Sequence, residues 1–306
     1  MGSKQGVTAP QGDDESPNMN AEPRAVAVGV LKGGHGKSTT SVNLARELAH
    51  RHDRALLVDL DDNGHLTNGM GFNHAFTADT NHTKRVYKER EDPREYIVNV
   101  TDGLDLFPSH EEIEETEDAL GSVTMGTTRV KQTVVDELLG DDYDYIVVDC
   151  PASRGKLNDN AMFATRNLII PLRPETGYDS GLTNTVSRLV MEARDAGIDD
   201  MSVLSVVPTD LQKRIDQATN DRKLLDAIHN REHVRSKLPN FAFRTDEEWE
   251  QIDNGTYDGP LPGIRHRETI GQTLTGTPVR DADTECDQLY CYEELAEIVE
   301  RGEVTR

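Results

Sequence analysis

Residues 24–38 read RAVAVGVLKGGHGKS, which is an apolar run followed at once by a glycine-rich turn. The continuous apolar run Arg24–Leu31 predicts a short buried strand. After the turn, apolar residues recur at helical spacing over residues 38–51, and the apolar run 55–59 predicts a second buried strand. The chain is therefore expected to open as strand, glycine-rich turn, helix and strand.

The glycine-rich turn has the composition of a phosphate-binding loop. Its glycines let the backbone wrap closely and point N–H groups inward, while the helix that begins near Ser38 adds the positive end of its dipole. We expect Lys37 to reach the β- and γ-phosphates of a nucleotide and the Ser38 hydroxyl to ligate Mg²⁺. The alternative is a plain glycine-rich turn, which would not require the Lys-Ser pair. The predicted nucleotide contacts are Gly33, Gly34, His35, Gly36, Lys37, Ser38 and Thr39.

Carboxylates follow two of the predicted strands. Asp59 and Asp61 come at and just after the end of the run 55–59, and Asp149 ends the apolar run 145–149. Open α/β sheets bind ligands at the carboxyl ends of their strands, so we expect these side chains near the phosphate loop. The alternative is that they cap the turns that follow.

The rest of the chain alternates apolar runs with helical patterns. Strand-like runs occupy residues 104–108, 145–149, 167–171 and 201–207, and helices are predicted over 178–196, 211–229 and 292–301. This alternation favours an α/β fold with a doubly wound, mostly parallel sheet and helices on both faces, as in P-loop NTPases. We expect a disordered polar tail over residues 1–23 and a single domain over 24–306, with polar insertions near 73–103 and 230–260. The acidic run 111–118 is interpreted as a solvated helix face.

The chain is strongly acidic. Its 306 residues include 56 Asp and Glu against 33 Lys and Arg, a formal net charge of −23. Such charge repels itself at low ionic strength and is screened by concentrated salt, which favours a protein from a high-salt (halophilic) cytoplasm. An ordinary acidic protein is the alternative.

Membrane insertion and secretion are not indicated. No apolar run approaches the roughly 18–20 residues that cross a bilayer, and residues 1–23 lack the pattern of a secretory signal. Cys150, Cys286 and Cys291 are too few for a disulfide framework, which fits a reducing cytoplasm. Cys150 is expected to be a small buried residue, and the other two to pack beside the last helix.

Three motifs resemble those of the ParA/MinD family of deviant Walker A ATPases. Lys32-Gly-Gly-His-Gly-Lys-Ser38 resembles the family's KGGxGK[ST], with Leu31 where the ordinary Walker pattern has glycine. The stretch Leu56–Thr67 is similar to LLVDxDPQGNLT, although Asp62-Asn63 replaces Pro-Gln and His65 replaces Asn. The segment Tyr143–Ser153 resembles DYIxxDxPPS.

The resemblance implies an Mg²⁺-dependent ATP hydrolase that forms a homodimer when it binds ATP. Lys32 would cross the dimer interface to the partner's nucleotide, and Asp61 would orient the attacking water. Asp59 would support the metal and a switch region, and Asp149 would hold Mg²⁺ through water. The loop Pro208-Thr209-Asp210 would contact the base.

Within this family, DNA partition is the branch that the residues favour. The C-terminal residues 293–306 are too acidic for a membrane-binding helix, and Cys286-x4-Cys291 has the wrong spacing for an iron–sulfur scaffold. Residues 213–237 carry a local charge of +3, with seven Lys and Arg against four acids. Sequence-independent DNA contacts are therefore predicted, with a ParB-like or other stimulating partner. The alternatives are helix faces balanced by nearby acids, and a switch for a protein cargo. The predicted DNA contacts are Lys213, Arg214, Arg265 and Arg267.

Overall fold

The strands of the protein form a mostly parallel sheet. The computed structural model describes residues 21–175, 178–212 and 220–306, and within them seven strands pair in the order β3-β4-β2-β5-β1-β6-β7. All neighbours are parallel except β3 and β4. The parallel strands therefore end at one common edge. The strands are β1 (Arg24–Val28), β2 (Ala55–Asp59), β3 (Val98–Thr101), β4 (Leu104–Phe107), β5 (Tyr145–Asp149), β6 (Asn167–Leu172) and β7 (Ser202–Pro208).

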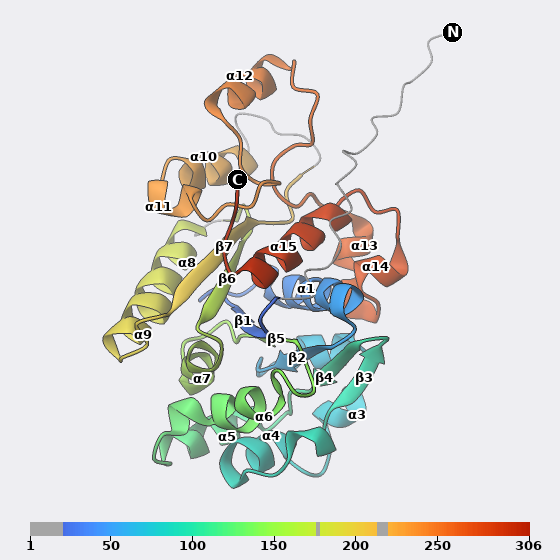
Figure 1. The fold of residues 1–306 in the computed structure, drawn as a ribbon, viewed down its shortest axis with the longest axis vertical. Helices are drawn as coiled ribbons and strands as arrows, with labels where there is room; N and C mark the ends of the chain where they lie inside the picture. Colours follow the sequence, from blue (N-terminus) through green and yellow to red (C-terminus); the bar gives the residue numbers. More distant parts are fainter. Residues whose placement is uncertain (1–20, 176–177, 213–219) are drawn as a thin grey trace.

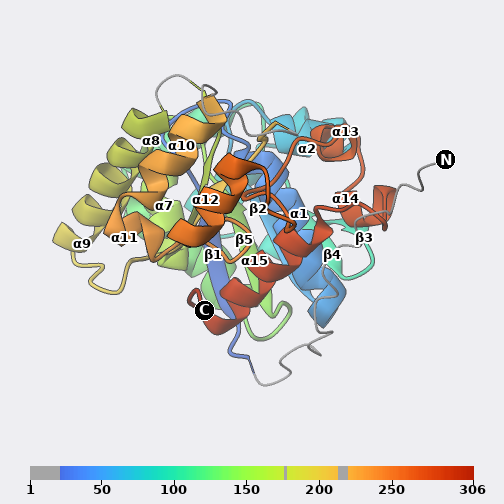
Figure 2. The ribbon, with the colours of Figure 1, turned by 90° about the horizontal axis from the view of Figure 1, so that it is seen from above.

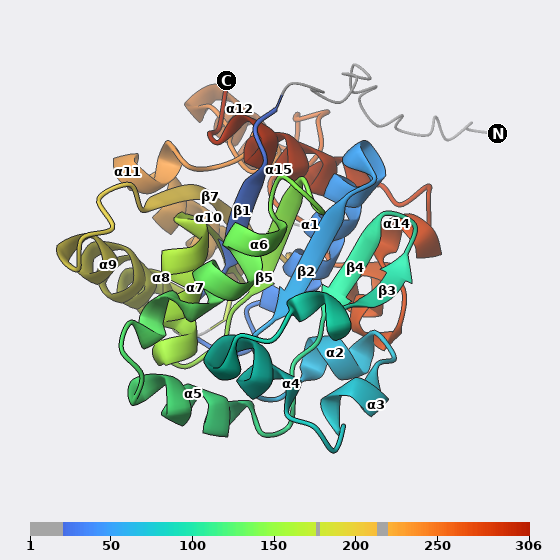
Figure 3. The same ribbon diagram turned by 60° about the horizontal axis from the view of Figure 1, so that its bottom comes forward.

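Helices cover both faces of this sheet (Figures 1 and 3). The helices α1 (Lys37–His52) and α15 (Leu289–Arg301) pack together on one face, while α6 (Asp136–Leu138) and α7 (Lys156–Thr165) lie on the other. Every residue of β2 and β5 is buried, as expected for strands covered on both sides. The predicted doubly wound α/β fold is confirmed.

The stretch 73–103, expected as an irregular or helical polar insertion, is made of short elements. It contains three short helical segments, α3 (Asn73–Phe76), α4 (His82–Lys84) and η2 (Pro93–Glu95), the π-helical turn η1 (Arg85–Glu89) and the edge strand β3. Val86 and Tyr87 in η1 are fully buried and belong to the main core. The strand was missed because β3 reads Val-Asn-Val-Thr, which is too short to give a clear alternation.

The acidic run 111–118 lies mostly in the amphipathic helix α5 (Ile113–Gly121), whose Ile113, Thr116 and Leu120 are buried.

The predicted helix 178–196 is present as α8 (Tyr178–Thr185), η5 (Val186–Met191) and α9 (Glu192–Asp195). Of the predicted helix 211–229, α10 (Asn220–His229) is present, and residues 213–219 lie outside the described part.

The stretch 230–260 contributes α11 (Glu232–Arg235) and α12 (Asp246–Asn254), which lie beside α10 at one end of the molecule (Figures 1 and 2). A capping box between Thr245 and Glu248 begins α12, and Trp249 is buried.

The remaining elements are α2 (His65–Gly69), η3 (Gly126–Thr128), η4 (Lys131–Val135), α13 (Glu268–Gly271), η6 (Thr273–Thr275) and α14 (Val279–Ala282).

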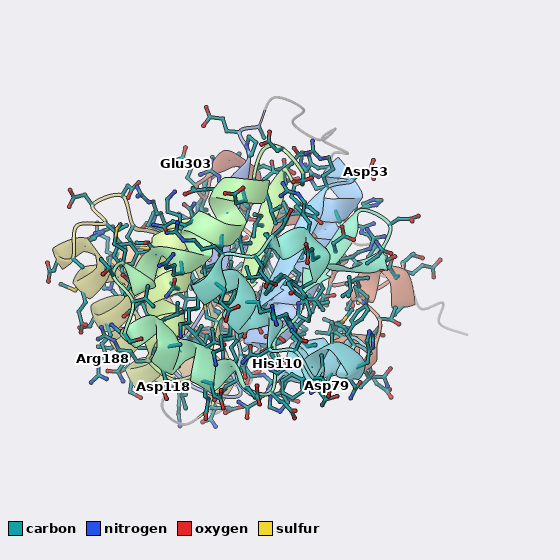
Figure 4. The ribbon with its side chains drawn as sticks, turned by 90° about the horizontal axis from the view of Figure 1, so that it is seen from below. Asp53, Asp79, His110, Asp118, Arg188 and Glu303 are labelled. Atoms are coloured by element: carbon teal, nitrogen blue, oxygen red, sulfur yellow. The ribbon has the colours of Figure 1, made fainter. Side chains whose placement is uncertain are left out.

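Acidic residues lie on more than one side of the molecule. Figure 4 shows Asp53, Asp79, Asp118 and Glu303 at separate points around the outline of the molecule.

Among the described residues, no helix combines the length and apolar character needed to cross a membrane.

Candidate active site

The phosphate loop joins β1 to α1 at the carboxyl edge of the sheet. Gly34 and Gly36 have φ of 77° and 79°, the left-handed region that glycine adopts without steric cost. Gly36 is the N-cap of α1 and no side chain caps its first turn, so the helix N-terminus remains available to an anion. A Cβ atom at Gly36 would lie 3.2 Å from Cγ2 of Thr209. The loop and the start of α1 are therefore shaped for a phosphate group.

Lys37, Ser38 and Asp149 are brought together beneath this loop. The Lys37 side chain is buried, and its charge and the hydroxyl of Ser38 both act on the Asp149 carboxylate to lower its pKa. Burial has the larger effect, so the pKa of Asp149 is raised to about 6. Ser41, which the sequence reasoning missed, donates a 2.7 Å hydrogen bond to Oδ1 of Asp149. Its position one turn after Lys37 in α1 was the available signal.

The residues around Asp149 fit a magnesium ion. Its Oδ2 atom is buried without a hydrogen-bond partner, and an unpaired carboxylate oxygen in this setting is costly unless a cation or water meets it. Mg²⁺ takes oxygen ligands and usually keeps several waters beside one or two protein groups and the substrate phosphates. The described residues contain no cluster of three or more His, Cys, Asp or Glu that could hold a metal by themselves.

Asp59 is committed to the loop that follows its own strand. Its Oδ1 accepts the N–H of Asp61 at 3.0 Å, and its Oδ2 accepts both the N–H and the hydroxyl of Thr67, at 3.0 and 2.6 Å. Burial and the neighbouring charge of Asp149 raise the pKa of Asp59 to about 7. Both oxygens are thus engaged in holding residues 61–67, which fits support of a switch better than direct metal ligation.

Asp61 lies at the start of that loop and is almost fully buried. Its Oδ1 accepts hydrogen bonds from the backbone and side-chain amides of Asn63, at 2.9 and 3.0 Å. Ser109, which follows β4, donates to the Asp61 carbonyl at 2.8 Å, and its N–H donates to the Thr67 hydroxyl. The sequence reasoning missed Ser109, because nothing in the short run 104–108 pairs it with residues 61–67.

The other predicted nucleotide contacts also surround the phosphate loop. Lys32 packs beside Gly181 of α8, where a Cβ atom would lie 3.6 Å from the Lys32 Cβ. Asp210, directly after β7, has a left-handed φ of 57°. It borders a cleft of about 500 Å³, lined by Arg173, Pro174, Glu175, Asp210, Gln212, Asn220 and Asp221.

The structure argues against Arg265 as a DNA contact. Its side chain is only 4% exposed and donates to the carbonyl oxygens of Gln212 and Pro262. Burial lowers its pKa to about 10. The sequence suggested a basic surface, but the bridge between Leu211 and Arg265 turns this arginine inward.

The neighbouring basic residues are engaged with acids. Arg267 forms a two-point ion pair with Asp287. In the run 213–237, Arg222 pairs with Asp226 and Asp253 and stacks on Trp249, while Arg231 pairs with Asp179 and Arg235 lies 3.9 Å from Asp246. For these residues the alternative of helix faces balanced by acids is the better interpretation. Lys213 and Arg214 lie outside the described residues.

Cys150, Cys286 and Cys291 are all buried. Burial raises the pKa of each thiol, so none has the environment of a reactive thiolate.

The fold and this site define a P-loop nucleotide-binding protein. The AAA_31 family model, described as an AAA domain, matches residues 23–196. The chain belongs to this family, and its motifs and relatives make it a ParA/MinD-type ATPase with a deviant Walker A loop.

Two curated relatives illustrate the branch. The chain is 33% identical over 198 residues to the sporulation initiation inhibitor protein Soj of Bacillus subtilis (strain 168). The matched residues make up 62% of this chain and 74% of that protein. It is 28% identical over 234 residues to the chromosome partitioning protein ParA of Caulobacter vibrioides, covering 73% and 87%.

Solved structures share the fold. An ATP complex of McdA from Cyanothece superimposes with a TM-score of 0.72 at 19% identity, covering 94% of this chain and 99% of that one. Cobyrinic acid a,c-diamide synthase from Mycobacterium smegmatis, with a bound ATP analogue and magnesium, gives 0.66 at 23% identity, covering 90% and 93%.

Proposed function

We propose that this protein is an ATP-dependent switch that hydrolyses ATP with Mg²⁺ and partitions or positions DNA, as a homodimer in its ATP state. The observation that carries the switch is the hydrogen bonding of Asp59 to both Asp61 and Thr67. Through the backbone N–H of Asp61 and through Thr67, Asp59 holds both ends of the loop 61–67 at the end of β2. In the proposed function, a change at the γ-phosphate would move this loop as a unit.

The proposed chemistry uses residues already placed around the loop. The loop N–H groups and Lys37 would bind the phosphates, and Ser38 and Asp149 would hold Mg²⁺, which supplies charge neutralisation at the γ-phosphate. Asp61 would hold the attacking water, and Lys32 would contact the nucleotide of the partner subunit. Pro208, Thr209 and Asp210 would face the base, beside the cleft that Asp210 borders.

DNA binding is proposed to be independent of sequence and to depend on ATP, since a dimer would bring two copies of Lys213 and Arg214 to one duplex. Lys213 and Arg214 are the candidate contacts that remain. The relative named as a chromosome partitioning protein supports this function. The protein would then act in the cytoplasm on the nucleoid, with a ParB-like or other partner that stimulates hydrolysis.

A second candidate is a positioning switch for a protein cargo. The observation that favours it is that Arg222, Arg231, Arg265 and Arg267 all contact groups of the protein itself. The chain is also 28% identical over 178 residues to the maintenance of carboxysome distribution protein A of Synechococcus elongatus.

Fluorescence anisotropy on a random-sequence duplex separates the two candidates. With ATP and Mg²⁺, wild type should bind and should lose affinity as KCl rises, and ADP should not support binding. Lys213→Glu with Arg214→Glu should lose DNA binding but keep ATP turnover, and Arg267→Glu is the matched control. Absence of ATP-dependent binding at every salt concentration where the protein is folded would reject DNA in favour of a protein cargo.

A further inference from the structure

Arg173 contacts two loops of the site that are far apart in sequence. It directly follows β6 and lines the cleft beside Asp210. Its Nη1 donates to the carbonyl oxygen of Gly34 at 2.9 Å, and its Nη2 lies 2.5 Å from Oδ2 of Asp210. One guanidinium thus joins the phosphate loop to the loop after β7.

The contact with Gly34 fixes the direction of a peptide group in the phosphate loop. A trans peptide is planar, and its C=O and N–H point in opposite directions. Because Arg173 holds the Gly34 carbonyl, the N–H of His35 must point away from Arg173. Gly34 has no Cβ and adopts a left-handed φ of 77°, so the peptide that follows it is less restricted than one between ordinary residues. The hydrogen bond from Arg173 to the Gly34 carbonyl oxygen therefore restricts rotation of this peptide group.

A second contact fixes the next residue. The backbone N–H of Arg173 donates to Nδ1 of His35 at 3.2 Å, and the imidazole is fully buried. Burial and the nearby charges of Lys32, Lys37 and Arg173 lower the pKa of His35 to about 4, so the ring is neutral at pH 7 and its Nδ1 can accept this hydrogen bond.

The other end of the brace is also held. Asp210 has a left-handed φ of 57°, which a non-glycine residue adopts only at a cost. Its Oδ1 lies 2.6 Å from Nδ1 of His266, while Arg173 holds Oδ2. Both oxygens of Asp210 are therefore engaged, and Arg173 pairs with a carboxylate that a second residue also holds.

We propose that Arg173 is a positioning residue that holds the phosphate loop in its binding conformation by joining Gly34 to Asp210. This inference rests on the proposed ATP binding and deepens it. The contribution belongs to nucleotide affinity, because the loop must keep its N–H groups aligned before the phosphates arrive. Without Arg173, the Asp210 carboxylate would lose the guanidinium that pairs with it, and its negative charge would be unbalanced beside the phosphate-binding loop.

The test compares Arg173→Gln, Arg173→Lys and Arg166→Gln. Arg166 precedes the other end of β6 and pairs with Asp200 at 2.5 Å, so it is a matched arginine away from the loop. For Arg173→Gln we expect the ATP dissociation constant and KM to rise at least about tenfold, the size of one lost hydrogen bond from a charged group, with kcat little changed. The melting temperature without nucleotide should stay near wild type, whereas the rise on adding ATP should shrink. Arg166→Gln should bind ATP as wild type does.

The variant Arg173→Lys distinguishes the effect of the two simultaneous contacts of Arg173 from the effect of its positive charge. Lysine is a point cation and cannot make both contacts at once, so this variant should bind ATP nearly as weakly as Arg173→Gln. Wild-type affinity in Arg173→Lys would show that charge alone matters and would overturn the brace, as would wild-type affinity in Arg173→Gln. If wild type itself neither binds nor hydrolyses ATP, the proposed function fails instead.

Discussion

Asp59 and Asp149 are register partners at the ends of the adjacent parallel strands β2 and β5, and both carboxylates are fully buried. Burial raises the pKa of both groups, to about 7 for Asp59, where the neighbouring charge of Asp149 adds to the effect, and to about 6 for Asp149. The Ser41 hydroxyl and the Lys37 charge favour ionised Asp149, while residues 61 and 67 hydrogen-bond to Asp59. Asp59 and Asp149 are therefore neighbouring buried carboxylates whose protonation changes the charge of the site.

Without nucleotide and Mg²⁺, this pair should make stability fall as pH rises. In the folded state both groups bind protons more tightly than in the unfolded chain, so their stabilising contribution is complete below about pH 4 and is lost as pH passes 6 to 7. A tenfold difference in proton affinity between the folded and unfolded states corresponds to about 1.4 kcal/mol. Urea unfolding between pH 5 and pH 8 should therefore show a smaller downward slope for Asp149→Asn than for wild type. Asp200→Asn, an exposed acid, is the control, and equal slopes for wild type and Asp149→Asn would contradict the raised pKa values.

Lys37 should be required for nucleotide binding. It is the buried cation at the start of α1 and acts on Asp149 directly. Lys37→Ala should lose most ATP affinity in calorimetry at high salt, by at least about a hundredfold for a buried charged contact. The control is Lys84→Ala, a partly exposed lysine that lies 3.7 Å from Glu115. Unchanged binding by Lys37→Ala would remove the phosphate-loop assignment.

Asp61 should act on hydrolysis and leave binding intact. A carboxylate that orients water lowers the barrier more than it stabilises the bound nucleotide. Asp61→Ala should keep the wild-type ATP dissociation constant but lose turnover by roughly a hundredfold or more. Asp79→Ala removes an exposed carboxylate outside the loop 61–67 and should turn over normally. Normal turnover by Asp61→Ala would move the role to Asp59 or elsewhere.

Gly64 should tolerate substitution less well than Gly71. Both have left-handed φ, 58° and 88°, so both share the backbone penalty of an added Cβ. A Cβ at Gly64 would lie 2.2 Å from the Phe76 ring, whereas at Gly71 nothing lies within 4 Å. Gly64→Ala should therefore lower the melting temperature more than Gly71→Ala and also reduce turnover, because it distorts the loop of Asp61. Equal losses in the two variants would show that the Phe76 contact is unimportant.

The sequence predicted the parts of the fold that local pattern controls. The long apolar strands, the glycine-rich turn and the carboxylates at strand ends were recognisable, because each depends on residues close in the chain. The contacts that depend on distant residues were not. Ser109 and Arg173 reach the site only through the order of strands in the sheet, and no local spacing records that order.

The charge pattern misled for the same reason. A local excess of Lys and Arg in residues 213–237 predicted a basic surface, but the described arginines pair with acids, and apart from Asp226 these acids come from elsewhere in the chain. Arg231 meets Asp179, and Arg222 meets Asp253 of α12. Arg265 is buried because its backbone bridges to Leu211, a contact across more than fifty residues.

Light scattering of Asp61→Ala with ATP and Mg²⁺ tests the central claim, an ATP-gated dimer, most directly. The variant should double its mass with ATP and remain a monomer with ADP, because the nucleotide is held without being hydrolysed. Adding Lys32→Ala should return it to a monomer while ATP remains bound, since Lys32 is proposed to contact the partner's nucleotide. A mass that stays the same with ATP and with ADP, in a variant shown by calorimetry to bind both, would contradict the account.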